Sequence, residues 1–141
     1  MQRTATAVWD GDLKSGSGHL TTGSNALAQQ KYTFASRFED GRETNPEELI
    51  AAAHAGCFTM AVTAELTKQG ITAKQLRTEA KVSLERVDNK PTIVGIALSL
   101  HAEVPGADRA VVQTAAETAK ADCPISRLVK APVTLEIDIV V

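Results

Sequence analysis

Two cysteines, Cys57 and Cys123, are the residues of this sequence whose chemistry stands out. Taken alone, Cys57 can be a small apolar residue packed among alanines, because free cysteine is among the most buried residue types. Cys123 precedes Pro124 at a predicted helix break. It can serve there as a plain helix cap, or the amides of the following turn can lower its pKa and favour the thiolate. If helix packing brings the two thiols together, they can close a disulfide reversibly, which is redox cycling.

A metal site is the alternative use of the same residues. His54 and Cys57 are three residues apart and so lie on one helix face, and Cys123 could be a third ligand. A convincing fourth ligand and a Cys-x-x-Cys pair are both missing, so we predict no metal. His54 is better explained as a packed helix residue. The sequence also has no Gly-x-Ser-x-Gly elbow, phosphate loop or dinucleotide fingerprint, which leaves ester hydrolysis and nucleotide chemistry without support.

Composition limits the class of protein and its partners. The 141 residues fit one domain, 1–141, that needs no disulfide framework to fold. With 15 basic and 17 acidic residues the formal charge is −2, and only one Trp, one Tyr and three Phe are present. Nucleic acid is therefore not an expected partner. The sequence start lacks an apolar signal region, and polar residues interrupt the most apolar window, Leu49–Leu66. We expect no membrane partner and a cytoplasmic location, where thiols stay reduced unless they cycle.

Hydrophobic periodicity and turn residues predict an α+β fold with antiparallel sheets and two principal helices. The first helix should begin at Pro46, capped by Thr44 or Asn45, and end near Gly70. It is apolar almost all round and rich in small residues, so we expect it to be buried. A second helix is expected over Ala107–Asp122. The other elements expected are strands at Thr4–Trp9, His19–Thr22 and Tyr32–Phe38, a hairpin of Lys81–Val87 with Thr92–Val104, a turn at Pro124–Val129, and a strand at Val133–Val141.

Three stretches resemble a known family. They are NPEELIAAAHAGCFTMAV around Cys57, AKADCPIS around Cys123, and FASRFED around Arg37. Together they closely resemble the OsmC branch of the OsmC/Ohr family, the osmotically inducible and organic hydroperoxide resistance proteins. The likeness spans essentially the whole chain. His54 favours the OsmC branch, since the Ohr branch tends to have a tyrosine there.

This resemblance implies an OsmC-like fold, an intertwined homodimer and a cysteine-based hydroperoxide reductase of oxidative and osmotic stress defence. It assigns Cys57 as the peroxidatic thiol, Cys123 as the resolving thiol, Glu47 as the acid of the Asn-Pro-Glu motif, and Arg37 as the active-site arginine. Arg42 competes for the arginine role, although as a solvated charge near Glu43 it needs no role in catalysis. No bound metal or organic cofactor is implied, and an external dithiol, of the lipoyl type among others, would be the reductant.

A mechanism follows from these roles. Burial makes a thiol a poor nucleophile, so Arg37, oriented by Glu47, is expected to favour the Cys57 thiolate. Apolar surroundings should favour organic over inorganic hydroperoxides. Ten residues of helix separate Glu47 from Cys57, so we expect shared sites in which a second copy supplies Glu47 and Arg37. Two other functions use the same features: a thiol redox sensor without turnover, and a small-molecule binding protein with inert thiols.

Overall fold

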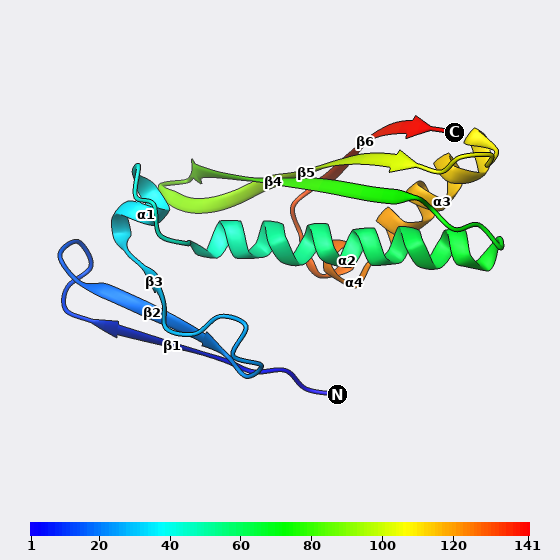
Figure 1. Ribbon diagram of the computed structural model, residues 1–141. Helices are drawn as coiled ribbons and strands as arrows, with labels where there is room; N and C mark the ends of the chain where they lie inside the picture. The colour runs from blue at the N-terminus through cyan, green and yellow to red at the C-terminus, as the bar shows by residue number, and fades with distance from the viewer. The chain divides into compact units, whose positions relative to one another are not determined.

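The computed structural model describes residues 1–141, which divide into two compact units, 1–49 and 50–141. The element order is β1 (Ala5–Asp10), β2 (Ser17–Thr22), β3 (Gln30–Tyr32), α1 (Phe34–Phe38), α2 (Pro46–Lys68), β4 (Gln75–Val87), β5 (Lys90–Glu103), α3 (Arg109–Asp122), α4 (Pro124–Leu128) and β6 (Val133–Val140) (Figure 1). The α+β class and the two principal helices are thus confirmed. That residues 1–141 form one domain stays a prediction, which a single cooperative unfolding transition would support.

The larger unit is built on the sheet β4-β5-β6. Strands β4 and β5 form the predicted hairpin, and its two-residue turn has Asp88 and Asn89 at φ 48° and 61°, the left-handed conformation that tight hairpins need. Strand β6 pairs with β5 in parallel, so this sheet is mixed rather than purely antiparallel. A parallel partner requires a crossover connection, and α3 and α4 provide it.

One face of this sheet carries the core. Along β5 the buried side chains alternate with outward-facing ones, and the buried set is Ile96, Leu98, Leu100 and Ala102. Phe58, Val62 and Leu66 of α2 belong to the same core cluster, as does Val112 of α3. The two long helices therefore cover the apolar face of the sheet, and the part of α2 beyond Ile50 runs along β4 and β5 (Figure 1).

Helix α2 has clear start and stop signals. The Asn45 side chain accepts a hydrogen bond from the amide of Glu48 at 2.8 Å, so Asn45 is the cap, and Pro46 takes the first helical position. At the other end the amides of Gly70 and Ile71 bond back to the last turn, with Gly70 at φ 71°. By length and composition alone α2 could cross a membrane, a test that core helices of soluble proteins also pass.

Only one stripe of α2 is buried, formed by His54, Phe58, Val62 and Leu66. The opposite stripe is exposed and consists mainly of small or apolar residues, namely Ala52, Ala53, Gly56, Met60 and Ala64, with Thr63 and Thr67 on the same side. The expectation of a helix buried all round is therefore wrong for the single chain. An exposed apolar stripe of this kind is typical of a surface that another molecule covers.

The smaller unit contains the antiparallel sheet β1-β2-β3, the helix α1 and the start of α2. The prediction of a strand over Tyr32–Phe38 is wrong, because β3 ends at Tyr32 and Phe34–Phe38 is helical. Thr33 and Ser36 form a reciprocal capping box that starts the helix. Phe34 and Phe38, four residues apart, stack with ring centres 5.0 Å apart, so their spacing fits a helix as well as a strand.

Candidate active site

The fold brings the two cysteines together. Cys57 lies in the middle of α2, and Cys123 lies between α3 and α4, where its extended ψ of 126° ends one helix and Pro124 starts the next. Their sulfur atoms are 3.0 Å apart in an S–H···S hydrogen bond, and both thiols are reduced. A disulfide needs about 2.05 Å, so a movement of about 1 Å would close the bond. The predicted contact between the two thiols is therefore present.

Only one of the two cysteines is exposed to solvent. Cys123 is completely buried, whereas Cys57 is partly exposed. A dissolved oxidant would therefore reach Cys57 first, and Cys123 could react only with the sulfur beside it.

The surroundings of the two thiols shift their pKa values in opposite directions. Burial raises the pKa of Cys57, and the contact with Cys123 adds to that rise. Burial also acts to raise the pKa of Cys123, but hydrogen bonds from Cys57 and from the first turn of α4 outweigh it, so this pKa is lowered. No cation contributes to the shift at Cys57. Within this unit the negative charge is therefore favoured on Cys123, and Cys57 needs a positive partner from elsewhere to become a nucleophile.

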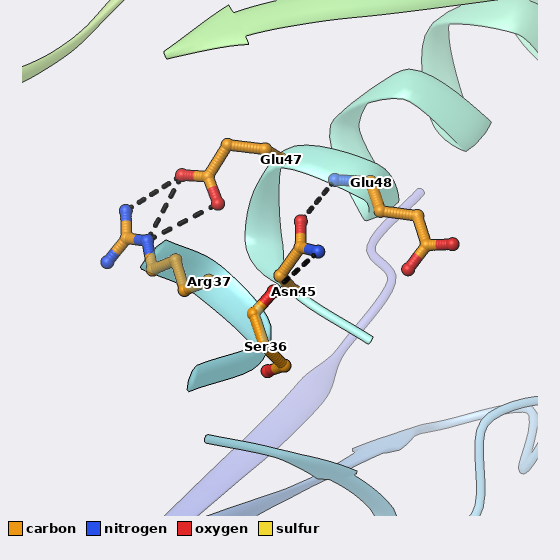
Figure 2. A network of polar contacts seen from close by, with 5 residues as sticks. All are labelled: Ser36, Arg37, Asn45, Glu47 and Glu48. Carbon is orange, nitrogen blue, oxygen red and sulfur yellow. Dashed lines mark hydrogen bonds and ion pairs between the residues drawn. The ribbon is translucent and has the colours of Figure 1, made fainter. Parts of the chain in front are cut away.

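Arg37 and Glu47 form a hydrogen-bonded ion pair in the smaller unit (Figure 2). The Nη2 of Arg37 donates to Oε1 of Glu47 at 2.9 Å, and Nε donates to the two carboxylate oxygens at 3.1 and 3.3 Å. The guanidinium also lies over the ring of Phe38 at 5.1 Å, which limits its rotation. Arg37 remains 40% exposed, so its outer nitrogen is free to bind another group.

Two partly buried hydrogen bonds fix this pair by joining α1 to the start of α2. The hydroxyl of Ser36, which is 5% exposed, donates to the carbonyl of Thr44 at 2.8 Å. The side-chain Nδ2 of Asn45 donates to the backbone carbonyl of Ser36 at 3.0 Å (Figure 2). Gly41 passes so close to the backbone of Ser36 that any side chain at that position would clash. The hydrogen bonds and close packing of the segment between α1 and α2 therefore hold Glu47 and Arg37 opposite each other.

Arg42, the competing arginine, is exposed and has no hydrogen bond or ion pair from its side chain. Glu43, which was expected near it, approaches Lys31 instead, at 3.8 Å. Ser36 was not predicted to help position the site. The spacing Thr33-x-x-Ser36 is a capping signal that could have revealed it.

The third residue of the metal alternative has another partner. His54 is completely buried, and its Nε2 lies 2.8 Å from the hydroxyl oxygen of Ser126 in α4. No three His, Cys, Asp or Glu side chains lie where they could together hold a metal ion. The contact between His54 and Ser126 was not predicted, because the two residues are 72 positions apart in the sequence and no motif links them.

Comparison with known proteins agrees with the fold and covers the segments around both cysteines. The OsmC-like protein family model matches residues 39–138. The protein named peroxiredoxin OsmC of Escherichia coli is 46% identical over 130 residues, covering 92% of this chain and 91% of that protein. The crystal structure of an organic hydroperoxide resistance protein OsmC from Legionella pneumophila has a TM-score of 0.72 at 26% identity and covers 98% of this chain and 97% of that one. The crystal structure of the organic hydroperoxide resistance protein OhrB of Bacillus subtilis has a TM-score of 0.71 at 26% identity and covers 97% of this chain and 98% of that one. The chain therefore belongs to the OsmC/Ohr family.

Proposed function

We propose that this protein is a thiol-dependent peroxidase that reduces organic hydroperoxides to alcohols. The observation that carries the proposal is the pair of reduced thiols 3.0 Å apart, of which only Cys57 meets solvent. The names of the relatives, a peroxiredoxin and organic hydroperoxide resistance proteins, support the same reaction class. Cys57 also packs against the apolar core cluster, which suits alkyl hydroperoxides better than hydrogen peroxide.

In the first half of the reaction, the Cys57 thiolate attacks the outer oxygen of the hydroperoxide. A sulfur–oxygen bond forms, the oxygen–oxygen bond breaks, and the alkoxide takes up a proton and leaves as the alcohol. We assign Arg37 to stabilise the thiolate and the charge that develops on the leaving oxygen. Glu47 orients Arg37 through the hydrogen bonds described above. Cys57 is left as a sulfenic acid.

In the second half, the Cys123 thiolate attacks the Cys57 sulfur. The disulfide forms, the sulfur–oxygen bond breaks, and the hydroxide released takes up a proton to become water. An external dithiol, of the lipoyl type or another, then reduces the disulfide back to two thiols. No resident metal or organic cofactor is needed in this scheme. We place the protein in the cytoplasm, where such reductants keep thiols reduced.

In this account the ion pair of Arg37 and Glu47 must come from a second copy of the chain. Helix α2 is continuous from Pro46 to Lys68, so Glu47 and Cys57 are about 15 Å apart along its axis. A carboxylate at that distance cannot orient an arginine that touches the same chain's sulfur. We therefore propose a homodimer in which each site combines Cys57 and Cys123 of one subunit with Arg37 and Glu47 of the other.

Two features of the single chain support this dimer. The small-residue stripe of α2, defined above, has no cover, and Met60 within it is 76% exposed. In addition, residues 1–49 bury no hydrophobic side chain, although an isolated three-stranded sheet needs an apolar face packed against something to be stable. An intertwined dimer would cover both surfaces.

The dimer can be tested at Gly56. A side chain added there meets no atom of its own chain, so Gly56→Leu should leave the monomer fold intact. Because the close approach of two helices would be blocked, we expect this variant to be monomeric in sedimentation velocity and to lose most activity. Gln113→Leu, at an exposed position on the other long helix, α3, is the control and should remain dimeric. An active dimer of Gly56→Leu would exclude this stripe from the interface.

Replacement of Cys123 by serine tests the resolving role. We expect the first oxidation to proceed at a nearly normal rate, because Cys57 is unchanged. The sulfenic acid then has no partner, and excess hydroperoxide should convert it irreversibly to sulfinic and sulfonic acid. Intact-mass measurement during a hydroperoxide titration would detect the added oxygens. Normal cycling with a dithiol and no over-oxidation would show that Cys123 does not resolve the intermediate.

The choice between the arginines rests on Arg37→Lys and Arg42→Ala. Lysine keeps the charge of Arg37 but lacks the planar group that binds Glu47 and an oxygen at once. We expect kcat/KM to fall by about 10²-fold, the usual loss for one such donor, and the pKa of Cys57 to rise. Arg42→Ala should have little effect, as its side chain has no partner. The reverse pattern would transfer the role to Arg42.

A further inference from the structure

A second polar contact joins α2 to α4 beside the two thiols. His54 precedes Cys57 by one helical turn, so the two side chains lie on the same side of α2. Ser126 lies in the first turn of α4, three positions after Cys123. The Nε2 of His54 and the Oγ of Ser126 are 2.8 Å apart. The same two segments of chain are thus joined twice, once through sulfur and once through this hydrogen bond.

The environment of His54 fixes which way this hydrogen bond points. Burial lowers the pKa of His54, so the ring is neutral and carries one proton. Its Nδ1 is buried and has no partner. A buried N–H without an acceptor is rarer in proteins than a bare acceptor, so the proton belongs on Nε2. His54 therefore donates to the oxygen of Ser126, and the hydroxyl proton of Ser126 remains free for another acceptor.

We infer that the Cys123 sulfur, three positions earlier at the N-cap of α4, accepts this proton. The amides of Ile125 and Ser126 and the Ser126 hydroxyl all favour its thiolate. The resulting chain of donors runs from His54 Nε2–H to Ser126 Oγ–H to Cys123 Sγ. Donors connected in this way polarise one another and strengthen the last hydrogen bond. The opposite role, with His54 taking the proton from Cys123, would create a buried imidazolium–thiolate pair, and the burial that lowers the pKa of His54 opposes the charged ring.

We propose that His54 is a positioning residue for the resolving step, because it holds the Ser126 hydroxyl in the orientation that stabilises the Cys123 thiolate. This inference rests on the proposed peroxidase function. Ser126 keeps its proton throughout: the sulfur–sulfur bond forms, the sulfur–oxygen bond of the sulfenic acid breaks, and the released hydroxide is protonated by water. The contact plays no part in the first step, in which Cys57 is the nucleophile.

Single-turnover kinetics separate the two steps. The protein would be mixed with cumene hydroperoxide, quenched at set times, and analysed by mass spectrometry for sulfenic acid and disulfide. In Ser126→Ala and His54→Leu we expect formation of the Cys57 sulfenic acid to stay within about twofold of the normal rate. Disulfide closure should slow by about tenfold or more, the effect of removing one hydrogen bond from a charged group. Ser99→Ala, on the exposed face of β5, is the control and should leave both rates unchanged.

His54→Gln tests positioning against packing. The glutamine amide can donate an N–H as Nε2 does, so it should restore disulfide closure to within a few-fold of normal, whereas leucine of similar bulk should not. Closure at the normal rate in both His54→Leu and Ser126→Ala would overturn the inference. Equal slowing by His54→Gln and His54→Leu would also overturn it, because packing alone would then explain the effect.

A titration tests the inference without any peroxide chemistry. In a Cys57→Ser background, Cys123 is the only thiol, and absorbance at 240 nm follows its ionisation. Adding Ser126→Ala or His54→Leu should raise the midpoint by about one pH unit, which is a tenfold change. The absorbance of a variant that lacks both cysteines is subtracted to correct for the ionisation of Tyr32. An unmoved midpoint would refute the role of the contact, whereas a moved midpoint in a protein that does not react with hydroperoxide would refute only the peroxidase function.

Discussion

Replacement of Cys57 by serine is expected to abolish hydroperoxide consumption. The hydroxyl of serine is a far weaker nucleophile than a thiolate, and Cys123 is completely buried and cannot take over. The rate with a dithiol reductant should fall on the order of 10⁴-fold or more, as for other enzymes that lose their nucleophile. A coupled assay of hydroperoxide loss, with cumene hydroperoxide as the substrate, measures this directly.

The fold of this variant should be unchanged, because serine is slightly smaller than cysteine and Cys57 is only partly buried. Circular dichroism and the oligomeric state provide the control. Cys123→Ser offers a matched comparison, since it removes one thiol of the same pair but should still react once with hydroperoxide. Retention of full activity by Cys57→Ser would remove this residue from the mechanism.

Mixing two inactive proteins should restore activity if the sites are shared between subunits. We expect Cys57→Ser and Glu47→Ala each to be inactive, the first without a nucleophile and the second without the group that orients Arg37. In a mixed dimer, one site combines the intact Cys57 of the second variant with the intact Glu47 of the first. The other site lacks both. Coexpression with two affinity tags would isolate the mixed dimer, and about half of the normal activity per dimer is expected.

Continued inactivity of a verified mixed dimer would contradict the shared site. Participation of Glu47 in its own chain's site would then require a break in the helix between Pro46 and Cys57. The structure shows no such break. A control mixture of Cys57→Ser with Cys123→Ser, which alter the same half of the site, should not recover normal cycling, because the thiol pair stays incomplete in every site.

The elements with strong end signals could be predicted from the sequence. Asn45 and Pro46 marked the start of α2, and the turn residues between β4 and β5 marked the hairpin. The segment Phe34–Phe38 was predicted incorrectly because two phenylalanines four residues apart satisfy both the strand and the helix period. The capping box of Thr33 and Ser36 decides for the helix, and it depends on only two side chains.

The candidate site was predictable only where a motif carried it. Cys57 and Cys123 stood out by residue type, and packing of α2 against the rest of the larger unit places them in contact. The parallel pairing of β6 and the link between His54 and Ser126 were not predictable, since both arise from contacts between distant segments. The exposed stripe of α2 was misjudged for a related reason. An apolar face has the same composition whether its own chain or a second chain covers it.

The central claim, that Cys57 and Cys123 turn over hydroperoxide as a pair, is tested most directly by the intact mass of the reduced protein after one equivalent of an organic hydroperoxide. The account predicts that one equivalent is consumed per chain, that the mass falls by two hydrogens, and that digestion yields a peptide linking Cys57 to Cys123. A dithiol should then restore the original mass, and repeated additions should be consumed in the same way. Oxidation that occurs once without turnover would indicate a redox switch. Thiols that react no faster than a free thiol would indicate an inert binding protein, and either result would contradict the account.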